Sequence, residues 1–203
     1  GFRAGFATAY HGLVQGGRLQ AGETVLIHGA AGGMGLAAVQ IAKQLGATVI
    51  ATSGSDAKLA VVGTCGADHL VNYKDGFREQ VKELTGGGVH YSFECIGLKQ
   101  TAEQSYMMLR PRGVSTIIGM IPPGVNIEVP GIELLVTEKR LQGAVMGSNR
   151  FRVDMPRFVD FYLSGKLHLD EMIAKHIRLA DVNDALSALQ SGQEARHVIM
   201  FDQ

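Results

Sequence analysis

The residues between Gly29 and Gly35 read Gly-Ala-Ala-Gly-Gly-Met-Gly, a run in which very little side chain stands between a ligand and the backbone. Ala30, Gly32 and Gly35 have the spacing of the GxGxxG pattern, with alanine in place of the first glycine. In that pattern the first small residue makes a tight turn, and the second glycine lets the backbone approach a pyrophosphate. The third glycine allows a helix to pack closely on a strand. This spacing predicts a phosphate-binding turn.

The segments on either side of this turn are of the types that phosphate binding requires. The run 24–29 is apolar and indicates a buried strand, while the apolar residues of 34–45 recur at helical spacing. The first N–H groups of a helix have no partner within it and lie at its positive dipole end. We therefore expect the N–H groups of Gly33 and Met34 to bind phosphate. A further strand follows Gly46, so we predict a dinucleotide site, with a purely structural glycine turn as the alternative.

The second predicted strand, 48–53, indicates which dinucleotide binds. Proteins that bind NAD usually carry Asp or Glu about 20 residues after the glycines. Here that place falls at Thr52 and Ser53, whose hydroxyls accept a 2′-phosphate that a carboxylate would repel. Lys58 is placed to reach this phosphate, and Tyr73 to flank the adenosine. We therefore predict NADP(H) as the cofactor; the alternative for Lys58 is an ordinary exposed lysine.

Alternation of strands and helices defines the predicted fold class. Helical patterns separate the apolar runs, and such alternation is typical of parallel strands that are buried on both faces. We predict an α/β fold, a doubly wound parallel Rossmann sheet in a three-layer sandwich, as a single domain over 1–203 with a leading helix in 1–20. The predicted strands are 24–29, 48–53, 68–71, 89–95, 113–120, 140–147 and 197–201. The predicted later helices lie around 77–84, over 153–163, and from 181 to near Gly192.

Composition narrows the function classes. The chain has 203 residues, a formal net charge of zero and 46% hydrophobic residues, without a basic run or a membrane-length apolar stretch. We therefore expect no nucleic-acid partner and no membrane partner. The N-terminus has no signal-peptide pattern, and the two cysteines, Cys65 and Cys95, have no partner at metal spacing. We interpret them as reduced thiols of a cytoplasmic protein.

The whole chain resembles the cofactor domain of the medium-chain dehydrogenase/reductase superfamily. The first half, TAYHGLVQGGRLQAGETVLIHGAAGGMGLAAVQIAKQLGATVIAT, is similar to NADPH quinone oxidoreductases and to enoyl reductases, including those of polyketide synthases. The second half looks like zinc alcohol dehydrogenases in the segments YSFECIG, LRPRGVSTIIGMIPP, KRLQGAVMGSNRF and ARHVIMF. The change falls near 86–90, so the chain is either an intermediate lineage or a chimera.

This resemblance implies roles for individual residues. It implies that most of them lie around the nicotinamide and its ribose: Thr8 near the ring, and Cys95, Ile96, Gly119, Met120, Ala144 and Met146 after successive strands. It also implies that Arg196 reaches the pyrophosphate. Core packing is the alternative for Cys95, Ile96, Ala144 and Met146, and a surface charge is the alternative for Arg196.

The resemblance also bears on zinc and on the reaction. In the zinc branch a cysteine ligand lies just upstream of the position of Thr8, and here Ala4 stands in its place, which favours a zinc-free reductase. Hydride would pass to an activated alkene, quinone or carbonyl. The substrate would be a small molecule bound largely by a GroES-like catalytic domain that this chain lacks and that the leading helix would join. The chain alone is therefore expected to bind cofactor with little turnover.

Three alternatives accompany this reading. The chain could be the cofactor domain of a zinc-type alcohol dehydrogenase, an enoyl reductase fragment of a polyketide synthase, or a non-catalytic dinucleotide-binding module. The resemblance further implies a homodimer formed through the edge strand near 140–147. The apolar segment 127–136, IEVPGIELLV, lies beside that strand and fits an interface.

Overall fold

A six-stranded parallel sheet forms the centre of the computed structural model, which describes residues 2–148, 150–190 and 196–201. Its strand order is β3-β2-β1-β4-β5-β6, so the chain winds outward from β1 in both directions. This order confirms the predicted doubly wound α/β class. The strands are β1 (Thr24–His28), β2 (Thr48–Ser53), β3 (His69–Asn72), β4 (Val89–Glu94), β5 (Leu109–Ile117) and β6 (Arg140–Gly143).

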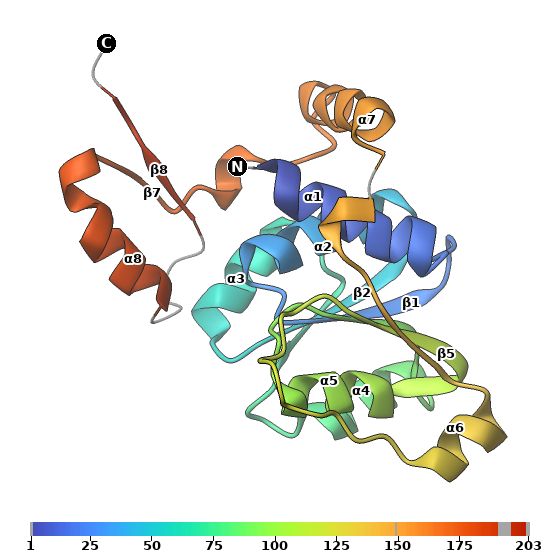
Figure 1. Cartoon of the computed structure of the whole chain (residues 1–203). Helices are drawn as coiled ribbons and strands as arrows, with labels where there is room; N and C mark the ends of the chain where they lie inside the picture. Colours follow the sequence, from blue (N-terminus) through green and yellow to red (C-terminus); the bar gives the residue numbers. More distant parts are fainter. Residues whose placement is uncertain (1, 149, 191–195, 202–203) are drawn as a thin grey trace.

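Helices cover both faces of this sheet and complete the three layers. Figure 1 shows α1, α2 and α3 on one face and α4, α5 and α6 on the other. None of the helices in the described ranges is long and apolar enough to cross a membrane. The helices are α1 (Phe2–Tyr10), α2 (Gly33–Gln44), α3 (Asp56–Thr64), α4 (Phe77–Thr85), α5 (Lys99–Met107), α6 (Gly131–Thr137) and α7 (Phe151–Leu163).

The side chains of β1 explain why its sequence is apolar without alternation. Val25 and Ile27 pack into the core beneath α2, together with Leu36. Leu26, between them in sequence, points to the opposite face and packs with Val81 of α4. All three β1 side chains are fully buried. Because successive residues of a strand face opposite sides and both sides are covered here, apolar residues are favoured at consecutive positions of the run.

The C-terminal part of the chain forms a second, smaller sheet. The strand β8 (His197–Ile199) lies within the predicted strand 197–201, but it pairs in parallel with β7 (Lys175–Ile177) and not with the central sheet. Helix α8 (Val182–Gln190) connects the two strands, and this unit stands apart from the central sheet (Figure 1). No apolar run predicted β7. Gly192, near the predicted end of the last helix, lies outside the described residues.

One buried side chain of α2 holds the segment that leads into this C-terminal unit. The amide of Gln40 accepts a hydrogen bond from the N–H of His168 at 2.6 Å and donates one to the carbonyl of the same residue at 3.2 Å. Gln40 is only 2% exposed, so this pair of bonds satisfies a polar group within the core. The exposed Gln44, one helical turn later, makes a single bond to the carbonyl of Lys166.

Replacing Gln40 with leucine should destabilise the protein by about 2 kcal/mol, because both polar groups of the His168 peptide lose their partner. Gln44→Leu is the matched control and should change the unfolding free energy by less than about 0.5 kcal/mol, since its bond is exposed. Urea unfolding followed by circular dichroism measures both values. Equal effects of the two substitutions would contradict the role given to Gln40.

Candidate functional site

The tight turn after β1 falls at Gly29. This residue has a φ of 81°, in the left-handed region that favours glycine. A Cβ at this position would lie 2.4 Å from Cγ1 of Ile96, so space as well as backbone conformation requires glycine. Ala30, the small residue that the sequence pattern assigned to the tight turn, follows Gly29 within this turn, which the N–H of Gly32 closes on the carbonyl of Gly29 at 3.4 Å. Ala30 is fully buried, and its N–H donates to the carbonyl of Thr52 at 2.9 Å.

The surroundings of the other two glycines agree with the pattern: Gly35 has no room for a side chain, and Gly32 is open. A Cβ at Gly35 would lie 2.4 Å from the carbonyl oxygen of Gly29 and 2.5 Å from Cα of Ala30. Only glycine therefore lets α2 pack this closely on the turn. Gly32 is exposed, and the nearest atom to a Cβ placed there would be the oxygen of Gly29 at 3.8 Å. The backbone at Gly32 is thus open to a ligand, and this cradle fits a pyrophosphate.

Arg196 lies above the first turn of α2. Its guanidinium Nη2 is 3.2 Å from the position of a Cβ on Gly33, so the charge adjoins the free N–H groups that begin the helix. Burial lowers the pKa of Arg196, and the guanidinium makes no ion pair within the described ranges. A partly desolvated cation at a helix N-terminus is suited to an anion. Arg196 therefore lies where the resemblance implies a pyrophosphate contact.

An open cleft of about 970 Å³ extends from this turn across the carboxyl ends of β1, β2 and β4. At one end it is lined by Ser53, Lys58 and Tyr73, the residues predicted for the adenosine side. Tyr73 lies over Gly54, where a Cβ would be 2.4 Å from its hydroxyl oxygen. Lys74, which was not among the predicted residues, also lines this end. Its position directly after Tyr73, at the same sheet edge, was the available signal.

Charge at this end of the cleft is mainly positive. The carboxylate of Asp56, the first acid after β2, accepts a hydrogen bond from Asn72 at 2.9 Å, and Asp56 is not part of the cleft lining. The side chains of Lys58 and Lys74 make no ion pair among the residues that the structure describes. This arrangement favours a phosphate over a free ribose hydroxyl as the bound group.

Apart from Thr8, the residues predicted around the nicotinamide lie at the carboxyl ends of β4, β5 and β6. Cys95 and Ile96 line the cleft. The turn after β5 packs against them through its backbone, because a Cβ at Gly97 would lie 2.7 Å from the nitrogen of Met120. Gly119 has no room for a side chain, since its Cβ would be 2.0 Å from the nitrogen of Gly97.

Three further predicted residues lie beyond the lining of this cleft, as do Gly119 and Met120. The N–H of Ala144 donates to the carbonyl of Ile117 at 3.1 Å, which places it directly after β6. Met146 is exposed in the next turn. Thr8 is buried in α1, and its hydroxyl donates to the carbonyl of Ala4 at 2.7 Å. The structure therefore groups Cys95, Ile96, Gly119 and Met120 and does not bring Thr8 into the cleft.

Two titratable groups near the turn are held in their neutral forms. Burial raises the pKa of Cys95 well above its usual range, and the nearby Glu94 adds to this, so the thiol forms a wall and not a nucleophile. Burial also lowers the pKa of His28, the last residue of β1. Its ring nitrogens lie 2.5 Å from the hydroxyl of Thr52 and 3.1 Å from the amide oxygen of Gln104. His28 therefore acts as a support beneath the cleft.

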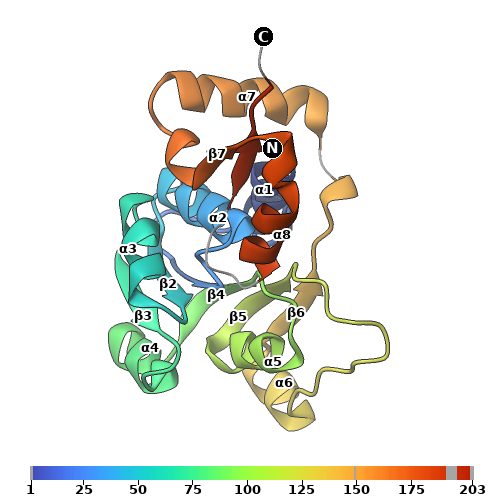
Figure 2. The same ribbon diagram turned by 90° about the vertical axis from the view of Figure 1, so that its left-hand side faces the viewer.

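The C-terminal segment covers part of the cleft, which sequence reasoning did not find. Glu171, Met172, Ala174 and Leu189 line it from this side. Figure 2 shows α8 in front of α2 in the turned view, and both Leu189 of α8 and Leu36 of α2 line the cleft. These residues are more than 130 positions from the glycine turn in sequence, and no local pattern connects them with it.

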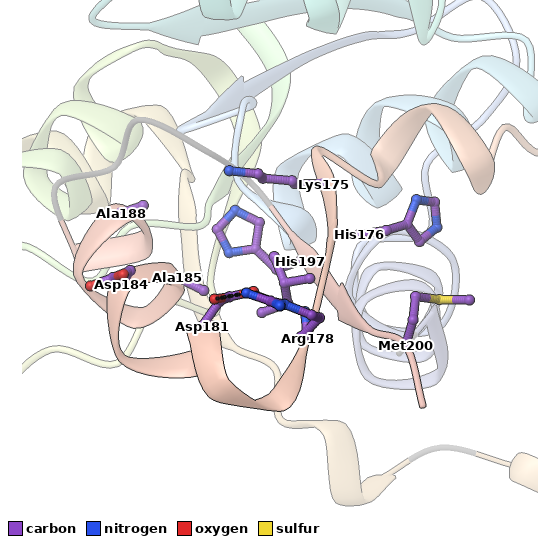
Figure 3. A pocket seen from close by; sticks show the side chains of 10 residues that line it. Lys175, His176, Arg178, Asp181, Asp184, Ala185, Ala188, His197 and Met200 are labelled. Carbon is purple, nitrogen blue, oxygen red and sulfur yellow. Dashed lines mark hydrogen bonds and ion pairs between the residues drawn. The ribbon is translucent and has the colours of Figure 1, made fainter. Parts of the chain in front are cut away.

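A second cavity, of about 570 Å³, lies within the C-terminal unit and shares no lining residue with the first. Lys175 and His197 are paired across β7 and β8, and Arg178 forms an ion pair with Asp181 (Figure 3).

Within the described ranges, no group of three His, Cys, Asp or Glu side chains could hold a metal ion. Ala4, at the position of the zinc cysteine, offers no ligand atom. The described residues therefore do not fit a zinc site of their own.

A comparison with protein families matches residues 33–164 to the family described as zinc-binding dehydrogenase. The matched range contains the last three residues of the glycine turn, helix α2, the strands β2 to β6 and the helices between them. It begins at Gly33, the first residue of α2.

Solved structures with the same fold include several dehydrogenases. Benzyl alcohol dehydrogenase from Acinetobacter calcoaceticus has a TM-score of 0.93 and 25% identity, with 99% of this chain and 56% of that chain covered. The alcohol dehydrogenase of Aeropyrum pernix has a TM-score of 0.85 and 29% identity, with 98% and 56% covered. A Sinorhizobium meliloti 1021 protein assigned as a zinc-binding dehydrogenase, bound to NADP, has a TM-score of 0.87 and 28% identity, with 98% of this chain and 58% of that chain covered. This chain therefore spans little more than half the length of each.

Two glycine substitutions should separate binding from folding. Gly32→Ala places a methyl group in the open cleft, so we expect a stability change within about 1 kcal/mol and at least about a tenfold loss of NADP⁺ affinity. Gly35→Ala brings Cβ against backbone atoms and should destabilise the fold by about 1–3 kcal/mol. Calorimetric titration and thermal unfolding measure these effects. Unchanged affinity in Gly32→Ala would show that no phosphate approaches this turn.

Proposed function

The chain belongs to the zinc-binding dehydrogenase family, within the medium-chain dehydrogenase/reductase superfamily, and on this premise we propose that it is an NADP(H)-binding cofactor domain. The convergence of three features on one cleft carries the proposal. These are the open backbone at Gly32, the guanidinium of Arg196 beside the cleft at the start of α2, which makes no ion pair among the described residues, and the cationic end with Lys58 and Lys74. The first two suit a pyrophosphate, and the third suits a 2′-phosphate.

Preference for NADP(H) over NAD(H) rests on the end of β2. Ser53 and Gly54, which line the cleft, occupy the place where NAD-binding proteins usually present a carboxylate. Lys58 approaches from the first turns of α3, and Lys74 from the loop after β3. The S. meliloti protein of the same fold was determined with NADP bound, which supports the same choice here.

For the reaction, we propose hydride transfer between the cofactor and an alcohol or carbonyl compound. The bound nicotinamide supplies the hydride chemistry, and the protein holds it in place and excludes water. Cys95 and Ile96 would form the wall of the cleft on that side. The names of the related alcohol dehydrogenases favour this substrate class over quinones and enoyl thioesters, to which the first half of the sequence pointed.

One observation keeps a second candidate function open. Ala4 replaces the cysteine that the zinc branch carries upstream of the position of Thr8. A zinc-free reductase of an activated alkene or quinone would have no need of that ligand, because hydrogen-bond donors can polarise a carbonyl instead. In either case we place most substrate contacts outside these 203 residues, so the chain alone should bind cofactor with little turnover.

We also propose that two copies associate along β6, the edge strand of the sheet. Its outer edge is unpaired in the sheet order, and the neighbouring α6 exposes Ile132, Leu135 and Val136 by 67–74%. An ion pair between Glu133 and the buried Lys139 holds α6 in this orientation. Pairing of two edges would cover the apolar residues and extend the sheet across both copies.

Charge reversal at Lys58 should weaken NADP⁺ binding selectively. Lys58→Glu brings a carboxylate to the adenosine end, so we expect the Kd for NADP⁺ to rise at least about tenfold, while the Kd for NAD⁺ changes by less than about threefold. Lys82→Glu, on the exposed side of α4, is the control with the same charge change and should leave both values unaltered. Equal losses for the two dinucleotides in Lys58→Glu would contradict the assigned phosphate site.

A single charge on α6 should disrupt the proposed dimer. Leu135→Glu places a carboxylate in the apolar surface, and we expect a shift from dimer to monomer at micromolar concentration in sedimentation velocity. Leu163→Glu is the matched control, because Leu163 of α7 is 76% exposed and Leu135 is 74% exposed. A wild-type chain that sediments as a monomer, or a dimer that survives Leu135→Glu, would refute this interface.

A further inference from the structure

A completely buried carboxylate stands at the end of β4, directly before the cleft-lining residues Cys95 and Ile96. Glu94 is 0% exposed. Its Oε1 accepts hydrogen bonds from the N–H groups of Ile96 and Gly97, both at 2.8 Å, and from the hydroxyl of Thr101 at 2.7 Å. Three donors thus converge on one oxygen of the carboxylate, while the other oxygen, Oε2, is buried without a hydrogen-bond partner among the described residues. They fold the backbone after β4 into a turn around the carboxylate.

The same residue also holds the turn after β5. The N–H groups of Ile118 and Gly119 donate to the main-chain carbonyl of Glu94 at 3.0 and 3.1 Å. A Cβ on Gly119 would be 2.6 Å from Oε2 of Glu94 and 2.0 Å from the nitrogen of Gly97. The two turns therefore meet around Glu94 without space for a side chain between them. Movement of the carboxylate would displace both.

Ile96 transmits this placement to the cleft. Its N–H is one of the three donors to Glu94, and its side chain lies over Gly29, where a Cβ would be 2.4 Å away. Ile96 lines the cleft and is 39% exposed. The wall of the cleft opposite its adenosine end thus depends on a carboxylate that itself never reaches the cleft surface.

We propose that Glu94 is a positioning residue that shapes the nicotinamide-ribose end of the cleft before the cofactor binds. This inference rests on the proposed function, because it assumes that a dinucleotide occupies the cleft. It assigns Glu94 to one half of the ligand only. The adenosine half would contact Ser53, Lys58 and Tyr73, none of which hydrogen-bonds to Glu94. Loss of the carboxylate should therefore weaken the contribution of the nicotinamide half and leave that of the adenosine half intact.

Titration of the 203-residue chain with NADP⁺ and with 2′-phospho-ADP-ribose, which lacks the nicotinamide, tests this directly. Glu94→Ala leaves three donors without an acceptor, and the Kd for NADP⁺ should rise about tenfold while that for the fragment changes less than about twofold. Glu94→Gln keeps an acceptor oxygen for the three donors. Its Kd for NADP⁺ should stay within about threefold of the wild-type value.

Thr101→Val provides a milder variant in case Glu94→Ala does not fold. It removes one of the three donors and retains the carboxylate, so we expect about a threefold rise in the Kd for NADP⁺ and no change for the fragment. The fluorescence of bound NADPH gives an independent signal, because a loosened nicotinamide should emit more like the free cofactor. The fluorescence of bound NADPH should shift toward that of the free cofactor in Glu94→Ala and should stay at the wild-type value in Glu94→Gln.

The outcomes distinguish this inference from the proposed function. Equal weakening of both ligands would overturn it, because Glu94 would then support the fold as a whole. It would also be overturned if the variants bound NADP⁺ as tightly as the wild type, or if the wild type bound the fragment as tightly as NADP⁺. A wild-type chain that binds neither ligand would refute the proposed function, and this inference with it.

Discussion

The contact between Gly35 and the backbone of Gly29 and Ala30 determines how closely α2 can follow β1. A Cβ added at Gly35 would lie 2.4–2.6 Å from these backbone atoms, so only a residue without a side chain allows the helix to start where it does. That starting point places the free N–H groups of α2 at the carboxyl edge of the sheet. Gly32 then leaves the backbone open, and the charge of Arg196 lies above it. The phosphate-binding features of the cleft all depend on this one close approach.

The rest of the sheet supplies the two ends of the cleft. On the side of β2 and β3 the lining is cationic and hydroxylic, through Ser53, Lys58 and Lys74. On the side of β4 it is apolar, through Cys95 and Ile96, with the charge of Glu94 enclosed beneath the surface. This polarity orients an asymmetric ligand, because a phosphate favours the first end and a flat, weakly polar ring the second. The doubly wound sheet separates the two ends of the cleft, because the strands on either side of β1 all end at the same edge.

Local sequence patterns predicted the features that depend on neighbouring residues. The central strands follow from apolar runs that are buried on both faces, and the glycine spacing follows from one turn between strand and helix. The contact of Glu94 with the turn after β5 and the place of Glu171 in the cleft lining could not be predicted in this way, because each depends on segments that only the tertiary structure brings together. The strand β7 was missed because Lys175 and His176 are exposed and its run is only three residues long. The first half of the sequence favoured quinone and enoyl reductases, whereas the whole fold matches alcohol dehydrogenases.

The central claim is that this cleft binds a dinucleotide with its 2′-phosphate at the cationic end. Isothermal titration of the chain with NADP(H) and NAD(H), in parallel and at two salt concentrations, tests it most directly. We expect NADP(H) to bind at least about tenfold more tightly than NAD(H), with a preference that decreases as salt screens the lysines. Tighter binding of NAD(H), or no binding of either dinucleotide, would contradict this account.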